Sequence, residues 1–144
     1  MTTAYAQLVT DVVAALSAAT PISNQVYRAR MRPIAAQHSD AIVVRLGATQ
    51  VVQKTLAYGR MLCQTELAVE CYAKAANSVA PDAAVDALLQ AAYARIAGDA
   101  TVNAAPRLVI MNAIAWDFDQ ENDQLGAATM TWQITHEVES AAIT

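Results

Sequence analysis

The chain has 144 residues, with nine Lys and Arg against 13 Asp and Glu, and alanine dominates its 56% hydrophobic fraction. This length fits a single domain over residues 1–144. A net charge of −4, with only nine Lys and Arg, disfavours the basic face that sequence-independent nucleic-acid binding requires. The N-terminus has no basic segment ahead of an apolar run, and no apolar run reaches the ~20 residues of a membrane helix. We therefore expect neither a secretory signal nor a membrane span.

Two segments have the apolar spacing of helices that pack on one side. The first predicted helix covers residues 4–20, with Thr2 or Thr3 as its cap and Pro21 at its end. The second covers residues 80–99, with Pro81 in its first turn and Gly98 at its end. The stripes expected to be buried are Tyr5, Leu8, Val9, Val12, Leu16 and Ala19 in the first helix and Val85, Leu88, Leu89, Ala92 and Ile96 in the second.

The remaining segments indicate strands. Residues 24–31 form a short candidate, and Pro33 beyond it suits a sheet edge. Residues 40–48 are apolar and β-branched, as in a strand covered on both faces. Residues 49–60 are polar and fit either a long loop or two irregular strand arms, which we expect a neighbouring chain to order. Residues 107–119 indicate one further strand, whereas residues 60–75 and 125–139 alternate with a period of two.

The alternating strands predict which of their faces is buried. These faces are Met61, Cys63, Thr65, Leu67, Val69 and Cys71 in the first strand and Ala128, Met130, Trp132, Ile134, His136 and Val138 in the second. Together the elements predict an α+β fold with an antiparallel or mixed β-sheet and two helices packed on one face.

An acidic run places carboxylates at alternate positions, at Asp117, Asp119, Glu121 and Asp123. A calcium loop that began at Asp117 would require glycine at its sixth position and glutamate at its twelfth. Those positions hold Asn122 and Ala128. The run fits a polar hairpin turn between two strands instead, and we expect no calcium binding.

The sequence gives little support to catalysis. Cys63 and Cys71 would lie about 26 Å apart on one strand, so they cannot pair, and free thiols suit a reducing cytosol. His38 and His136 lack the spacing of metal ligands, and we expect His136 to be partly buried. No serine lies in a nucleophile-elbow pattern. We predict no enzymatic activity, no metal and no cofactor; the alternative is a small-molecule-binding or enzymatic domain with a pocket between the helices and the sheet.

The order of elements resembles the tail terminator proteins of long-tailed phages, the minor tail protein U type. Three stretches carry the resemblance: "PIAAQHSDAIVVRLGA", "QTELAVECYAKA" and "WDFDQENDQLGAATMTWQITHEV". It extends from Leu8 to Val138. His136 and the alanine-rich second helix depart from the family pattern and leave a neighbouring head–tail joining family open.

The resemblance implies an assembly protein of a phage or prophage. Such a subunit forms a ring, with six copies expected, that caps the tail tube, ends its growth and prepares the surface for head joining. The implied partners are further copies of the chain, the tail tube protein and the head–tail connector protein, with no membrane and no sequence-specific nucleic acid. The implied location is the virion tail, and the host cytoplasm during assembly.

A ring requires two different surfaces that meet between neighbours. One candidate surface is the basic run Arg28, Arg30 and Arg32, whose other interpretation is a solvated strand edge or loop. Its expected counterpart is Asp117 with Asp119, because complementary charges set register and orientation. The polar segment adds further candidate interface residues, which are Gln53, Lys54 and Arg60.

Overall fold

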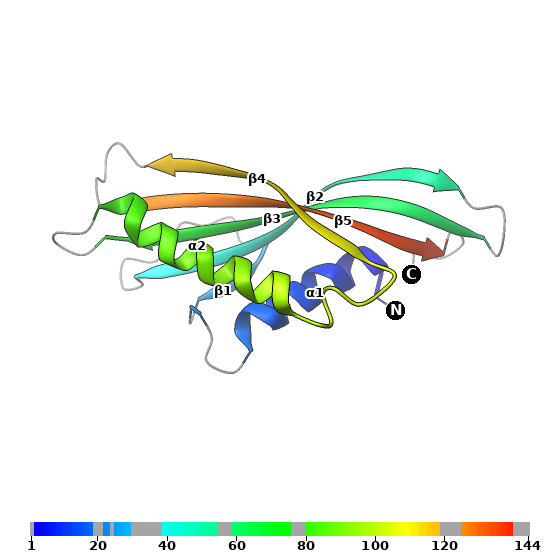
Figure 1. Ribbon diagram of the computed structural model, residues 1–144, viewed down its shortest axis with the longest axis horizontal. Coiled ribbons are helices and arrows are strands. Elements are labelled where there is room, and N and C mark those ends of the chain that lie inside the picture. Colours follow the sequence, from blue (N-terminus) through cyan, green and yellow to red (C-terminus); the bar gives the residue numbers. More distant parts are fainter. Residues whose placement is uncertain are drawn as a thin grey trace.

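The computed structural model describes residues 2–18, 22–23, 25–29, 39–54, 59–75, 80–118 and 125–139. The elements in chain order are α1 (Ala4–Ser17), β1 (Val26–Arg28), β2 (Asp40–Lys54), β3 (Arg60–Lys74), α2 (Pro81–Gly98), β4 (Leu108–Phe118) and β5 (Leu125–Glu139). The five strands form one mixed sheet, and both helices pack against it (Figure 1). The predicted fold class is confirmed.

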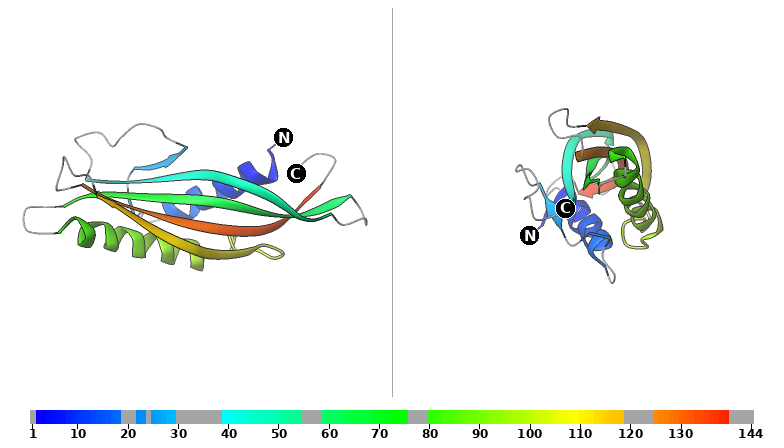
Figure 2. Two further views of the ribbon diagram at one scale, coloured as in Figure 1. Left: turned by 90° about the horizontal axis from the view of Figure 1, so that it is seen from above. Right: turned by 90° about the vertical axis from the view of Figure 1, so that its left-hand side faces the viewer.

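The sheet is long and strongly twisted, with the strand order β1-β2-β3-β5-β4 (Figure 2). β1 runs parallel to β2, and the other neighbouring pairs are antiparallel. β2, β3 and β5 each have 15 residues, about three times the usual strand length, and this makes the molecule elongated. β1 and β4 are the two edge strands, so the edge position expected for the first strand is confirmed.

The polar segment after Gly47 belongs to the sheet. β2 continues to Lys54 and pairs with β3 from Thr49↔Thr65 to Lys54↔Met61, with register shifts on either side of the Thr49–Val51 stretch. We call this pairing the hairpin arm, made of residues 49–54 of β2 and 60–65 of β3. Of the two interpretations that the sequence left open, the strand arms are correct, and residues 55–58 between them lie outside the described part.

One apolar layer fills the space between the helices and the sheet. The buried stripe of α2 consists of the five residues that the helical spacing predicts, and the predicted inner faces of β3 and β5 are buried from Cys63 to Cys71 and from Ala128 to Val138. Trp132 is only 2% exposed and stacks on Tyr93 of α2, with a ring-centroid distance of 5.4 Å. The expectation that Trp132 lies in the core is confirmed.

The ends of the helices follow their capping chemistry. α1 begins after Thr3, whose hydroxyl accepts a hydrogen bond from the Ala6 N–H at 3.2 Å. The described helix ends at Ser17, three residues before the predicted end. α2 starts with Pro81 in its first turn, where a missing N–H costs nothing.

β4 contains a bulge that changes the direction of its side chains. The register with β5 shifts between Met111 and Ala113, which leaves Asn112 as an extra residue. Before the bulge, Met111 pairs with Trp132 and faces the helices. After it, Ile114 and Trp116 pair with the core residues Met130 and Ala128 and face the helix side again.

Candidate subunit interface

Large apolar side chains that remain exposed gather on two strands. Among the described residues these are Leu108, Ile110, Ile114 and Trp116 on β4, Leu46, Val51 and Val52 on β2, and Tyr93 on α2. On β4 they lie on both faces of the sheet, because Leu108 and Ile110 pair with Thr135 and Gln133 on the face away from the helices, whereas Ile114 and Trp116 are on the helix side. Scattered single residues of this kind are normal on a protein surface, but contiguous groups of them mark interaction sites. The two rows define the candidate interface.

The first row lies along an edge strand that carries little protection against pairing. β4 extends over 11 residues without lysine or proline, the residues that commonly protect such edges, and its one charged residue is Asp117. Trp116 is 44% exposed and lines a hollow of about 450 Å³ together with Asp82, Ala83 and Asp86 of α2. We call Ile114, Trp116 and these three α2 residues the β4–α2 surface.

The second row lies on the hairpin arm. β1 pairs with β2 only from Ile42 to Val44, so the outer edge of β2 beyond that point has no strand partner within the described residues. Every β2 side chain from Leu46 to Lys54 is exposed, and Val52 reaches 53%. Among the described residues of the chain, none covers Val51 and Val52 enough to exclude water from them.

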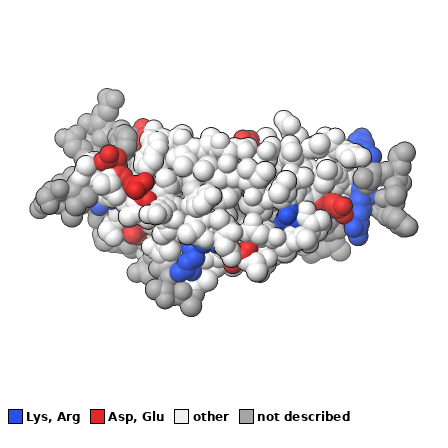
Figure 3. Space-filling view, in the orientation of Figure 1, with Lys and Arg blue, Asp and Glu red and all other residues white. Residues whose placement is uncertain are grey.

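Charges are sparse between the two surfaces and concentrate toward the ends of the molecule. On the face shown in Figure 3, the upper part of the middle is largely uncharged; acidic side chains gather toward the start of α2, and basic side chains with an acidic patch beside them lie toward the hairpin arm. Asp82, Asp86 and Asp117 contribute acidic groups at the first end. At the arm end, Arg60 forms an ion pair with Glu137 at 3.0 Å, and Lys54 adds a further positive charge.

The structure separates the residues that the charge pattern predicted to meet between neighbours. Arg28 is on β1 and Asp117 is on β4, so they occupy opposite edges of the sheet, as a contact between two different surfaces requires. Arg28 also donates hydrogen bonds to the Thr10 hydroxyl at 3.1 Å and to the Ala6 carbonyl at 3.2 Å, which tie it to α1.

Several predicted site residues lie outside the described part of the chain. They are Arg30 and Arg32 after β1 and Asp119 after β4; His38, Glu121 and Asp123, which were not predicted to form a site, lie outside it as well. Gln53 and Lys54 lie at the exposed end of β2, with Arg60 opposite them at the start of β3. The pairing of the two charged patches therefore stays a prediction.

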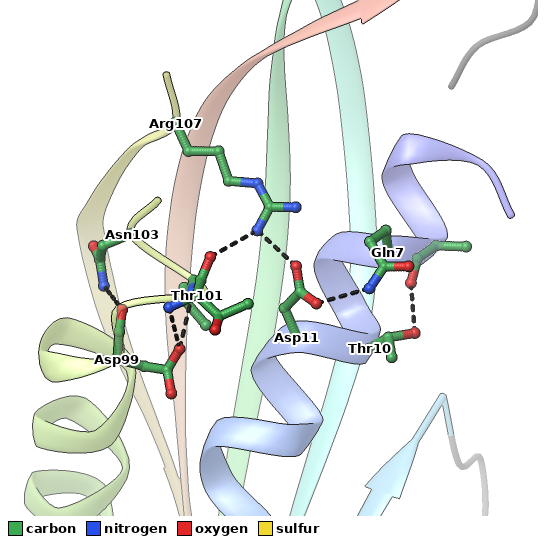
Figure 4. A network of polar contacts seen from close by, with 9 residues as sticks. Gln7, Thr10, Asp11, Asp99, Thr101, Asn103 and Arg107 are labelled. Carbon is green, nitrogen blue, oxygen red and sulfur yellow. Dashed lines mark hydrogen bonds and ion pairs between the residues drawn. The ribbon is translucent and has the colours of Figure 1, made fainter. Parts of the chain in front are cut away.

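A polar network fixes the start of β4 and was not predicted (Figure 4). Arg107, the residue before β4, contacts Asp11 of α1 through Nη1 and Oδ2 at 2.7 Å and donates to the Thr101 carbonyl at 3.2 Å. Gln7 donates to the other carboxylate oxygen of Asp11 at 2.8 Å. The signal in the sequence was a carboxylate at Asp11 inside an apolar stripe, because a buried charge requires a partner.

The turn between α2 and β4 is held by the same network. Asp99 Oδ1 accepts from the backbone N–H groups of Thr101 and Val102 at 2.9 Å each. The Asn103 side chain donates to the Ile96 carbonyl at 2.8 Å and to the Asp99 carbonyl at 2.9 Å, which satisfies backbone groups at the end of α2. The end of α2 and the start of β4 are thereby held as one unit.

The thiols and the histidine within the described residues are buried, and burial shifts the pKa values of Cys71 and His136. Cys63 and Cys71 are free and buried, as expected, and burial raises the pKa of the Cys71 thiol to about 12. His136 contacts the Thr65 hydroxyl through Nε2 at 2.8 Å and lies edge-on to Tyr5. Burial, with a smaller contribution from Arg107, lowers the pKa of His136 and favours its neutral form. His136 is thus a satisfied core residue.

The sheet face away from the helices carries polar side chains together with the exposed Leu108 and Ile110. Gln133 donates to Gln64 at 3.2 Å and accepts from Asn112 at 3.3 Å, which links three neighbouring strands. Arg45 and Glu70 form an ion pair at 3.1 Å on the same face. No group of three or more His, Cys, Asp or Glu within the described residues could hold a metal ion. None of the described helices is long and apolar enough to cross a membrane.

Comparisons with known proteins support the fold. No protein-family model matches the chain, and no curated protein matches it. Among solved structures, the chain is similar to a chain of the virion of native gene transfer agent (GTA) particle, with a TM-score of 0.56 and 16% sequence identity. The match covers 93% of this chain and 98% of that chain. At this identity the likeness shows that the two chains share a fold over nearly their whole lengths.

Proposed function

We propose that this chain is a structural subunit of a phage-like virion and that it acts as its tail terminator. In this role, copies of the chain form a ring, with six expected, on the end of the tail tube. The ring stops the addition of tube subunits and presents its other side to the head–tail connector. The activity is assembly, with no chemical step.

The observation that carries this proposal is the fold likeness, which covers almost all of both chains and whose partner is a chain of a GTA virion. Two exposed apolar rows on different strands add support, because a subunit of a closed ring requires two different surfaces. The resemblance of three sequence stretches to tail terminators gives the finer assignment.

Removing the gene from the genome that encodes the particle tests the role. We expect over-long tail tubes without joined heads in electron micrographs, and normal particles when the wild-type chain is supplied from a second copy. Tails of normal length that lack heads would instead assign the chain to head–tail joining. Unchanged particles would contradict the proposal.

Oligomeric state provides an independent measurement. Native mass spectrometry of the purified chain over a range of concentrations should give a closed oligomer, with six subunits as the expected number. A chain that remains monomeric at high concentration and also fails to bind purified tail tubes would overturn the proposed ring.

A further inference from the structure

We propose that the hairpin arm of one subunit docks on the β4–α2 surface of the next copy of the same chain. This inference rests on the proposed ring and names the two surfaces that would build it. The arm supplies Val51, Val52 and Lys54, and the receiving surface supplies Ile114 and Trp116 with the acidic residues beside them.

Both surfaces carry apolar groups next to an open strand edge. Natural sheets commonly protect an exposed edge with lysine, proline or a short strand. β4 has none of these over its 11 residues, and the protection that it carries is its bulge at Asn112 with the single charge of Asp117; the arm has one lysine at its end. A copy that covered both edges would remove Val52, at 53% exposure, and Trp116, at 44%, from water. A tryptophan beside a hollow is the type of residue that dominates binding energy at interfaces.

The charges identify the occupant as another copy of this chain. Asp82 and Asp86 line the hollow beside Trp116, and Asp117 follows it on β4. The arm ends in Lys54, and the opposite strand of the arm begins with Arg60, which is paired with Glu137. Glu139 of β5 is opposite Arg60, so the acidic groups of β5 balance Arg60 and the positive group that the arm brings to the acidic surface is Lys54. A contact between Lys54 and this acidic surface fixes the orientation of the docking.

The arm cannot reach the β4–α2 surface of its own chain. Val51 pairs with Cys63, whereas the start of α2 lies over Gly126, which pairs with Ala73. Cys63 and Ala73 are ten residues apart along β3, or about 33 Å at the rise of a strand. The two surfaces lie at opposite ends of the molecule (Figure 1), so the contact is head-to-tail and generates a ring when the rotation closes.

A double cysteine variant tests the contact directly. Val52→Cys on the arm and Ala83→Cys in the hollow are too far apart to bond within one chain, because a disulfide requires Cα atoms within about 7 Å. Under mild oxidation, purified ring or intact particles should therefore give a ladder of covalent oligomers on a non-reducing gel. The highest band would report the number of subunits in the ring.

Matched variants control for incidental disulfides. Val52→Cys alone, and Val52→Cys combined with Ala97→Cys at the far end of α2, should give no ladder. The native Cys63 and Cys71 are buried and do not compete. A ring or an intact tail that forms without any ladder from the test pair would overturn the docking and leave the proposed function intact.

A charge exchange tests the same contact without cysteine chemistry. Lys54→Glu or Asp86→Lys alone should raise the concentration needed for ring assembly by about three- to tenfold, because each places like charges together. The two substitutions combined should restore assembly. Ala14→Glu, an exposed change on α1, should leave assembly unchanged. Single variants without effect, or a combined variant that assembles no better than either, would overturn the docking.

Discussion

The buried contact between Asp11 and Arg107 gives the sharpest stability prediction. Their side chains are 10% and 19% exposed, and the contact joins α1 to the residue that begins β4. In the Asp11→Ala variant, Arg107 keeps only the Thr101 carbonyl, at 3.2 Å, among the contacts described for it. The positive charge then lies in a largely dry site without a counter-charge.

The magnitude follows from how dry the site is. Removing one partner of a fully buried ion pair costs about 3–5 kcal/mol. Because about a fifth of the Arg107 side chain already contacts water, we expect Asp11→Ala to lower the free energy of unfolding by about 2–3 kcal/mol. This is a large part of the roughly 5–15 kcal/mol typical of a domain.

The assay is urea unfolding followed by circular dichroism, at a concentration where the wild-type chain is monomeric. Arg107→Met and the double variant complete a cycle, and the coupling should be about 1–3 kcal/mol. The reasoning would be refuted if the two single variants lowered the free energy of unfolding by amounts that add up to the loss in the double variant, or if Asp11→Ala lowered it by less than about 0.5 kcal/mol. Either result would show that water replaces the Asp11 carboxylate beside Arg107.

Substitutions at three further positions test the core and its pH dependence. Trp132→Ala should lower the free energy of unfolding, measured with urea, by about 3–5 kcal/mol. Trp132→Phe should lower it far less, because the buried indole N–H has no acceptor in the described structure and its removal loses no hydrogen bond. Equal losses for the two variants would contradict this. Gly126→Ala should cost about 1–3 kcal/mol, because its Cβ would lie 2.7 Å from Val85 Cγ2 and 2.8 Å from the Pro81 carbonyl oxygen; a neutral result would mean that α2 shifts freely. The folded protein holds His136 neutral, so the contribution of this residue to the free energy of unfolding should be fully present above its ordinary pKa of 6.5 and should be lost as the pH falls below it. His136→Gln should therefore make the free energy of unfolding less dependent on pH between pH 7.5 and 5. An unchanged pH dependence would contradict the assignment.

The sequence predicted the elements whose two faces differ strongly. The alternation from Met61 to Cys71 and the apolar stripe of α2 each have one dry side, so their periodicity is visible without any neighbour. Residues 49–54 carry no such contrast because all of their side chains are exposed, and a strand there could not be distinguished from a loop.

The candidate site depended on contacts between distant parts of the chain. Asp11 and Arg107 are 96 residues apart, and neither segment alone indicates the other. The apolar row of β4 was predicted as a strand, but its place at the sheet edge follows from the strand order, which local patterns do not determine. Arg28 was predicted as an interface residue, and only the structure reveals its hydrogen bonds to α1.

The bulge at Asn112 has a consequence for how this chain can change in evolution. If the strand kept its length but lost the bulge, so that Asn112 paired with Thr131, strict alternation would turn Ile114 and Trp116 to the opposite side of the sheet and bring Ala115 to the side of α2. Composition would hardly change, yet the surface offered to a neighbour would be replaced. We therefore expect relatives of this chain either to keep the bulge or to lose one residue together with it, because both leave Ile114 and Trp116 on the side of α2.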